Sequence, residues 1–500
     1  MAVLANFSIF ILILILPCVF ASNYYTSSYE LQILFEKEIT FTNKLKDLMK
    51  EYPALKKDLP RARTILADVL VTRESISDDI INNPLNQFLL MWKFFHDWAY
   101  IANDLIKVGM KSPYDENFDL VALSGEIKSA QVSEKDLRNA ELAILRVQEF
   151  YHLDAIDVIR GKISNYTAIR ALVEKQANDI VLKAVEQGDT CGAYNWSKAM
   201  IQLKMNVIED GRLLTRNPPS QKKCAATICS TGAGESYCIL KDDSTARYQK
   251  ACNTKSYNYP KGRKKRAACS LNAIHPSQIL QPIKTEQISV NPPIYQFHEV
   301  YTSQECDHIW ATGAAIQKRS TVASDPREKI TVSERRVGTN SWLGDDSSVV
   351  DMFSRRVGYA TGMQMSPEDV EKWQAASYGI GGHYNLHHDY LPEYADQLAH
   401  LGQRYATFMV YLSDLPLGGA TAFPHLDLSF FPSKGSALFW FDISLAGEPL
   451  TLTLHGGCPV LLGAKHIGNK WIRYNPQFLT YPCGRSPNSI AKLPKSLCRY

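Results

Sequence analysis

The segment SYGIGGHYNLHHDYLPEYA places a histidine and an aspartate two residues apart, at His387 and Asp389. Side chains two apart on a β-strand project from the same face. We therefore expect these two side chains to enter one cavity, and His388 to face away from it. An imidazole and a carboxylate are two of the three ligands in the facial group that binds non-haem Fe(II) and leaves other positions open. The spacing therefore predicts a metal site whose third ligand must come from elsewhere in the chain.

His455 is the predicted third ligand. It follows the strand-like run LTLTLHGG, 66 residues beyond Asp389, where a jelly roll brings a later strand back beside an earlier one. His425, after GGATAFP, and His466 are the alternatives. Ten residues beyond His455, Lys465 ends the apolar run VLLGAK. A lysine there suits the free carboxylate of a dicarboxylate that binds the metal by its other end, because its ammonium is a compact charge.

Short strand-like segments surround these residues. They are ATFMVYLSD, GSALFWFD, LTLTLHGG and CPVLLG, and Gly, Pro or Asp separates them. Several short strands at close spacing predict a barrel or jelly roll. The residues from 282 onward are therefore expected to form a β domain that positions the metal ligands.

The first half of the chain is expected to be helical. YELQILFEKEITFTNKLKDLMKEY has apolar residues at helical spacing, so one face needs a partner, either within its own bundle or on a second copy of the chain. LVEKQANDIVLKAVEQ and AYNWSKAMIQLKMNVIE form a predicted helical hairpin, broken at Gly188 and Asp189. This hairpin resembles one tetratricopeptide-type repeat, although a stable array needs about three. The fold class expected is α+β and multidomain.

Length and composition limit the possibilities further. The 500 residues suggest two to four domains, and a net charge of +4 gives no argument for nucleic-acid binding. The run IFILILILPCVF is too short to span a bilayer and is typical of a secretory signal cleaved near Ala21. No later stretch is apolar enough to span a membrane. Eleven cysteines less Cys18 leave ten, which favours disulfides in an oxidising compartment.

Four motifs in order resemble the α subunit of the animal collagen-type prolyl 4-hydroxylases, members of the 2-oxoglutarate- and Fe(II)-dependent dioxygenases. The motifs are YGIGGHYNLHHDY, YLSDLPLGGATAFP, KGSALFWFD and HGGCPVLLGAKHIGNKW. The similarity is tight from about 293 to 483, looser from 27 to about 203, and poor between about 204 and 281. It implies a double-stranded β-helix (jelly-roll) catalytic domain.

The resemblance also implies roles for individual residues. His387, Asp389 and His455 would bind Fe(II), and Lys465 would pair with the distal carboxylate of 2-oxoglutarate. Tyr378 and Thr421 would contact that carboxylate through their hydroxyls. Trp471 would form a wall of the pocket, and Arg404 would face the peptide. The sequence departs from the family at Arg473, where a histidine is usual, and in having a single helical hairpin, so turnover, peptide affinity and substrate range are expected to differ.

The activity implied is hydroxylation of peptidyl proline at C4 in collagen-like substrates of the secretory pathway. It would be coupled to oxidative decarboxylation of 2-oxoglutarate to succinate and CO2, with Fe(II), O2 and L-ascorbate. The alternatives are a related oxygenase acting on another secreted peptide, or a catalytically silent binding or assembly subunit. Peptide-stimulated decarboxylation of 2-oxoglutarate separates the three.

Partners and covalent links are also implied by the resemblance. Family members pair with protein disulfide isomerase in an α2β2 assembly in the endoplasmic reticulum lumen, and dimerise through the N-terminal helices. The end of this chain, SLCRY, is no retention signal, so a retained partner would be needed. The family's disulfides imply the pairs Cys252–Cys269 and Cys458–Cys483.

The expected division of the chain has six parts. It comprises a signal peptide (1–21), a helical dimerisation-type domain (22–160), a hairpin region for peptide binding (161–210), a linker rich in Cys, Lys and Pro (211–281), the dioxygenase domain (282–484) and a tail (485–500). Within the linker, a loop tied by Cys252 and Cys269 is expected, with a processing site at Arg263–Arg266 as an alternative.

Overall fold

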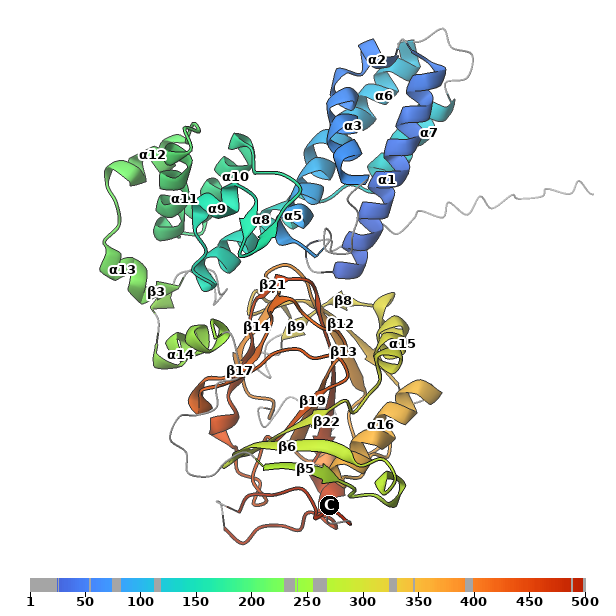
Figure 1. Cartoon of the computed structure of the whole chain (residues 1–500), viewed down its shortest axis with the longest axis vertical. Coiled ribbons are helices and arrows are strands. Elements are labelled where there is room, and N and C mark those ends of the chain that lie inside the picture. The colour runs from blue at the N-terminus through green and yellow to red at the C-terminus, as the bar shows by residue number, and fades with distance from the viewer. Residues whose placement is uncertain are drawn as a thin grey trace, which may run out of the picture.

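The computed structural model places a helical half above a β-rich half (Figure 1). It describes residues 25, 27–53, 55–73, 82–111, 118–228, 239–240, 242–254, 268–322, 331–344, 347–391, 399–486 and 489–497. The apolar run at 9–20 and the basic run at 261–266 lie outside these residues. Among the helices described, none combines the length and the apolar character needed to cross a membrane.

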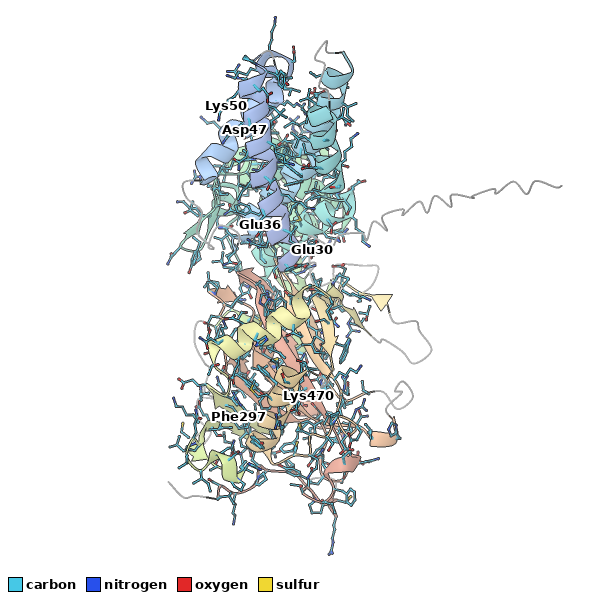
Figure 2. The ribbon with its side chains drawn as sticks, turned by 90° about the vertical axis from the view of Figure 1, so that its right-hand side faces the viewer. Glu30, Glu36, Asp47, Lys50, Phe297 and Lys470 are labelled. Carbon is cyan, nitrogen blue, oxygen red and sulfur yellow. A yellow bond between two sulfur atoms is a disulfide. The ribbon has the colours of Figure 1, made fainter. Side chains whose placement is uncertain are left out.

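The N-terminal bundle begins with α1 (Ser28–Glu51), whose first turn is capped by the Ser27 hydroxyl. Glu30, Glu36, Asp47 and Lys50 lie along its outer side (Figure 2), while Leu31, Leu34 and Leu45 are fully buried on the other. The apolar face of α1 therefore packs within its own chain. The bundle is completed by α2 (Leu55–Asp58), α3 (Pro60–Arg73), α5 (Pro84–Lys93), a π-helical turn η1 (Phe94–Trp98), α6 (Ala99–Lys111), α7 (Phe118–Ser129) and α8 (Glu134–Phe150).

The predicted helical hairpin is present as α10 (Glu174–Glu186) and α11 (Thr190–Gln202). Gly188 separates the two helices at φ +72°, a conformation that favours glycine. The surrounding elements are α9 (Ala155–Ile159), β1 (Lys162–Ile163), β2 (Tyr166–Thr167), α12 (Glu209–Arg216), α13 (Gln221–Ala226), β3 (Thr227–Ile228), β4 (Ile239–Leu240) and α14 (Asp243–Cys252).

Two antiparallel sheets face each other in the C-terminal half. The large sheet has the order β5 (Ala268–Asn272), β6 (Ile283–Val290), β7 (Pro293–His298), β19 (Ala437–Phe441), β15 (Arg404–Tyr411), β22 (Lys465–Arg473), β13 (Trp373–Tyr378), β12 (Thr339–Leu343), β8 (Lys318–Arg319). The small sheet has the order β11 (Arg336–Val337), β14 (His383–His387), β20 (His455–Gly457), β17 (Thr421–Phe423), β18 (Leu428–Phe430). This arrangement confirms the predicted fold class.

Each face of the large sheet has its own core. On the outer face, α15 (Ser303–Ala314) and α16 (Ser348–Thr361) pack against Phe297, Phe408 and Phe439. On the inner face, Met409 and Tyr411 meet Phe423 and Phe430 of the small sheet. Successive side chains of β15 therefore enter different cores, which is why its sequence is apolar throughout. Short pairs complete the domain: β9 (Thr321–Val322) with β10 (Thr331–Val332), and β16 (Leu417–Gly418) with β21 (Val460–Leu462).

The helical half contacts the β domain at the turn that leads into β14. Gly381 has φ +56°, and a side chain there would approach Ala143 of α8 to 3.1 Å. Arg146 of α8, fully buried, donates a hydrogen bond to the Gly381 carbonyl at 3.1 Å. The glycines in YGIGGHY therefore permit a close helix–turn contact just before the predicted metal-binding segment.

The strand predicted at LTLTLHGG is shorter than expected. Thr451–Thr453 form a 3-10 turn, and only His455–Gly457 belong to a strand. The Thr453 hydroxyl donates to the Leu450 carbonyl at 2.6 Å. This local bond satisfies the backbone in a turn rather than in a strand.

The disulfides expected from the family are wrong. Cys252 at the end of α14 bonds to Cys458, a residue 206 positions away that follows β20. Cys269 and Cys483 are exposed free thiols. A second disulfide joins Cys191 to Cys224. The described residues around α14 also differ from the solvated loop expected for the linker, because Tyr248 and Cys252 of α14 pack in a buried cluster with Cys458.

Candidate active site

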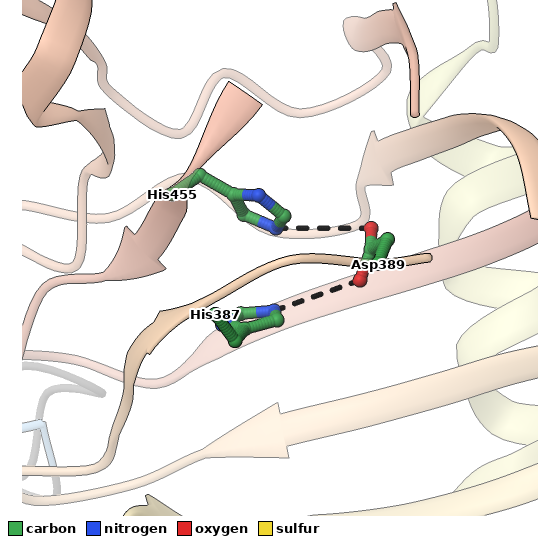
Figure 3. A group of neighbouring side chains, drawn as sticks. All are labelled: His387, Asp389 and His455. Carbon is green, nitrogen blue, oxygen red and sulfur yellow. Dashed lines mark ion pairs between the residues drawn. The ribbon is translucent and has the colours of Figure 1, made fainter. Parts of the chain in front are cut away.

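Two neighbouring strands of the small sheet bring the three predicted metal ligands together. His387 ends β14 and lies opposite His455 of β20 in the strand register. Asp389 follows two residues after β14 ends, and its oxygens lie 3.6 Å from His387 Nε2 and 3.7 Å from His455 Nε2 (Figure 3). The ligand atoms of all three residues lie within 4.8 Å of one another. Two imidazoles and one carboxylate on one side of a cavity suit Fe(II).

Backbone carbonyls orient both imidazoles. His387 Nδ1 lies 2.7 Å from the Asn385 carbonyl, and His455 Nδ1 lies 2.9 Å from the Thr453 carbonyl. Each Nδ1–H donates to its carbonyl, which leaves the Nε2 lone pair directed at the metal position. Burial lowers the pKa of His387 well below its usual value, so this ring is neutral, as a ligand must be.

Asp389 is held in its charged form. Burial alone would raise the pKa of this carboxyl, but His455, His387 and Arg404 outweigh burial and lower it to about 2. The Thr407 hydroxyl donates to Asp389 Oδ2 at 2.8 Å and also lies 2.9 Å from Asp442 Oδ2. Burial, followed by the nearby Asp389 charge, raises the pKa of Asp442 well above the usual range. A neutral Asp442 can donate to Thr407, which frees the Thr407 hydrogen for Asp389.

Lys465 lies inside the barrel, with only 3% of its surface exposed. Its Nζ donates to Thr421 Oγ1 at 3.2 Å, and the Tyr411 hydroxyl reaches the same oxygen at 3.0 Å. Tyr378 is its cross-strand partner in the β13–β22 register. Burial lowers the pKa of Lys465 to about 7. An anionic ligand in the cavity would therefore favour the charged form of this amine.

One cavity joins the three predicted metal ligands to Lys465. The lining includes the predicted residues Tyr378, Thr421 and Trp471 together with the metal group and Lys465. It also includes residues that sequence reasoning missed, chiefly Arg336, Tyr384, Met409, Trp440, Ile467 and Asn469.

The missed residues differ in how predictable they were. Asn469 lies between Lys465 and Trp471 on alternate positions of one strand, so the period of two indicates it directly. Arg336 comes from β11, far away in the sequence, and no local pattern marks it. Its guanidinium stacks 4.7 Å from the Tyr384 ring centre and donates to Gln374 at 2.8 Å.

Arg404 and Arg473 lie behind the cavity wall and are not among the residues that line it. Arg404 forms two 2.7 Å hydrogen bonds to the Glu371 carboxylate, and its guanidinium lies 3.9 Å from the Trp471 ring centre. Arg473 Nη2 lies 2.9 Å from the same carboxylate, and Nη1 donates to the Gly402 carbonyl at 2.9 Å. Glu371, which sequence reasoning missed, therefore anchors both arginines and supports Trp471.

The remaining histidines of the sequence argument lie elsewhere. His388 stacks on Tyr390 with ring centres 4.7 Å apart. His425 lies 3.1 Å from the Ser244 hydroxyl, and His466 stacks on Trp310. Within the described part of the chain, only His387, Asp389 and His455 form a group that could hold a metal.

Comparisons with known protein families agree with both halves of the chain. Residues 373–473 match the family model "2OG-Fe(II) oxygenase superfamily", so the β domain is a 2-oxoglutarate- and Fe(II)-dependent oxygenase domain. Residues 27–165 match "Prolyl 4-Hydroxylase alpha-subunit, N-terminal region". Both models match in one chain, and relatives named prolyl 4-hydroxylase alpha subunits match along most of its length, so the similarity to this family covers both halves of the chain.

Three of these relatives show the extent of the similarity. Prolyl 4-hydroxylase subunit alpha-2 of Caenorhabditis elegans is 28% identical over 82% of this chain and 84% of its own length. Subunit alpha-1 of Rattus norvegicus is 25% identical over 94% and 97%. Subunit alpha-3 of Homo sapiens is 39% identical over 42% and 39%. Among solved structures, a viral collagen prolyl hydroxylase from Paramecium Bursaria Chlorella virus-1 in complex with 2OG matches with a TM-score of 0.29 and 25% identity, over 36% of this chain and 95% of its own.

Proposed function

We propose that this chain is the catalytic α subunit of a prolyl 4-hydroxylase. It hydroxylates peptidyl proline at C4 in collagen-like substrates of the secretory pathway and converts 2-oxoglutarate to succinate and CO2. The observation that carries this proposal is a single cavity with a 2-His-1-carboxylate group at one wall and a buried lysine at another.

Bound Fe(II) supplies the oxidising power that no side chain has, because C4 of proline carries an unactivated C–H bond. His387, Asp389 and His455 would hold the metal and leave it open to the co-substrate. The carbonyl contacts to both imidazoles and the Thr407 hydroxyl fix the ligand geometry in advance.

Lys465 selects the co-substrate. Its ammonium would pair with the distal carboxylate of 2-oxoglutarate, while Thr421 and Tyr378 add hydroxyl contacts. Because Lys465 is buried, this ion pair is shielded from water and is stronger than a surface pair. Trp471 closes the cavity beside the metal group, and Arg404 and Glu371 keep its ring in place. Excluding water at this wall protects the reaction from unproductive turnover.

The assembly and location follow from the resemblance. We infer that the chain pairs with protein disulfide isomerase as the β subunit of an α2β2 assembly in the endoplasmic reticulum lumen. We further infer dimerisation through the N-terminal helices and the use of L-ascorbate to maintain Fe(II). Asn165 and Asn195, the acceptors of two glycosylation sequons, are exposed, as glycan attachment requires.

The decisive experiment measures 2-oxoglutarate decarboxylation by the Fe(II)-loaded full chain with and without a (Pro-Pro-Gly) repeat peptide. We expect peptide to stimulate turnover and 4-hydroxyproline to form in equal amount to succinate. Turnover without stimulation would indicate another peptide substrate. A metal-loaded chain without turnover would indicate a binding or assembly subunit. The His387→Ala variant serves as the control without a complete metal group.

A further inference from the structure

A large apolar side chain lies half exposed at the edge of the sheet that carries the cavity. Trp342 of β12 has 47% of its surface exposed, although it belongs to an otherwise mostly buried strand. An indole combines a large apolar face with a polar edge, so exposed tryptophans beside pockets are effective ligand anchors. Whether Trp342 can contact a ligand therefore depends on where it lies relative to the cavity.

The strand register places Trp342 on the face that lines the cavity. Trp342 is paired with Gln374 of β13, and Gln374 is paired with Asn469 of β22. Residues directly opposite each other on neighbouring strands project from the same face. Asn469 lines the cavity. The indole of Trp342 therefore extends the cavity face toward the edge of the sheet.

Trp342 also adjoins a residue of the cavity wall. Its ring centre lies 5.9 Å from that of Trp471, and the two planes are tilted by 42°. Trp471 is 6% exposed, lines the cavity, and its Nε1 has no hydrogen-bond partner among the described residues. β8 pairs only with Thr339 and Asn340, so no described strand covers β12 at Trp342. The two rings form a continuous aromatic surface from the cavity to the sheet edge.

We propose that Trp342 and Trp471 together form a subsite for a proline that flanks the residue held at the metal. This inference rests on the proposed function and assigns a specificity-determining role to Trp342. A proline-rich chain is a polyproline II helix with a rise of about 3.1 Å per residue, so the distance between the rings corresponds to roughly two residues. Pyrrolidine rings pack on aromatic faces.

The test compares the full chain with Trp342→Ala, Trp342→Phe and Tyr100→Ala. Tyr100 is 39% exposed on α6 of the helical bundle and serves as the matched control. Fluorescence anisotropy of a labelled (Pro-Pro-Gly) repeat peptide gives binding without turnover. Decarboxylation of 2-oxoglutarate gives KM and kcat, and thermal unfolding shows that each variant is folded.

We expect Trp342→Ala to raise peptide Kd and KM about tenfold, the factor that about 1.4 kcal/mol provides. We expect kcat and the peptide-independent decarboxylation to stay within about twofold, Trp342→Phe to retain most of the affinity, and Tyr100→Ala to match the wild type. With the wild-type chain, a peptide in which the proline two residues from the target is replaced by alanine should bind with a similarly raised Kd. With Trp342→Ala, the same replacement in the peptide should raise Kd little further.

The outcomes are distinct. If wild type binds and hydroxylates the peptide but Trp342→Ala has the same Kd, the subsite is wrong and the proposed function stands. If Trp342→Ala lowers peptide-independent decarboxylation as much as peptide binding, the residue is structural. If wild type neither binds the peptide nor responds to it, the proposed function and the subsite fail together.

Discussion

Replacing Lys465 by alanine tests the assignment of the co-substrate site most directly. Lys465 is 3% exposed and contacts Thr421 through its ammonium. Its pair with the distal carboxylate of 2-oxoglutarate would therefore be largely desolvated. Removing one partner of a buried ion pair costs about 3 to 5 kcal/mol, because the other charge stays buried without compensation. We expect the Kd of 2-oxoglutarate to rise by roughly 100- to 4,000-fold.

The assay is an anaerobic titration of the Fe(II)-loaded chain with 2-oxoglutarate, followed by the absorption band of the bound co-substrate. A parallel titration uses 2-oxovalerate, which has the same keto acid end but lacks the distal carboxylate. Wild type should prefer 2-oxoglutarate strongly, whereas Lys465→Ala should bind both acids with similar affinity. Thr421→Val removes one hydrogen-bonding group and should cost only about tenfold.

Metal affinity is the control for this prediction, because Lys465 is not a metal ligand and its loss should leave Fe(II) binding unchanged. Refutation would come from a Lys465→Ala variant that still prefers 2-oxoglutarate over 2-oxovalerate by the wild-type ratio. In that case another cation, such as Arg336 in the same cavity, would be the carboxylate partner.

Four further results are expected. His387→Ala should lose at least about 100-fold in Fe(II) affinity and show no absorption band with 2-oxoglutarate; a normal band would contradict its role as a ligand. The pKa of Lys465 is lowered to about 7, so its cation is present below pH 7 and lost above it. The affinity for 2-oxoglutarate should therefore fall by up to about tenfold per pH unit above 7, and this pH dependence should be absent from Lys465→Ala. Thr407→Val should weaken Fe(II) binding about tenfold in a competition assay with a chelator, because it removes the 2.8 Å hydrogen bond to the Asp389 carboxylate. Unchanged affinity would show that this bond does not position a metal ligand. Cys252→Ser should lower stability by about 2 to 4 kcal/mol in thermal or denaturant unfolding, whereas Cys269→Ser should have little effect; equal effects of both would favour the pairing expected from the family.

Local pattern predicted several of the residues that the structure brings together at the site. The spacing of His387 and Asp389, and the position of Lys465 at the end of an apolar run, were readable because the side-chain period of a strand assigns faces over a few residues. The choice of His455 over His425 and His466 needed an assumed jelly roll. The structure brings His455 to the site by pairing β20 with β14.

Sequence spacing did not predict contacts between residues that are remote in the chain. Cys252 and Cys269 are close in sequence, yet α14 carries Cys252 to the small sheet beside Cys458, while Cys269 lies on the outermost strand of the large sheet. Glu371 was missed for a related reason, because no local repeat links it to Arg404 and Arg473.

The sequence by itself determined the helical and β-rich halves, the types of the predicted metal ligands and the buried lysine, since each depends on periodicity within one element. Only the tertiary structure decided which cysteines bond, which carboxylate holds the two arginines, and that Trp342 meets Trp471. Those contacts depend on the order of strands in the two sheets and on where α14 docks, and long-range order of this kind is set by the packing of the whole domain.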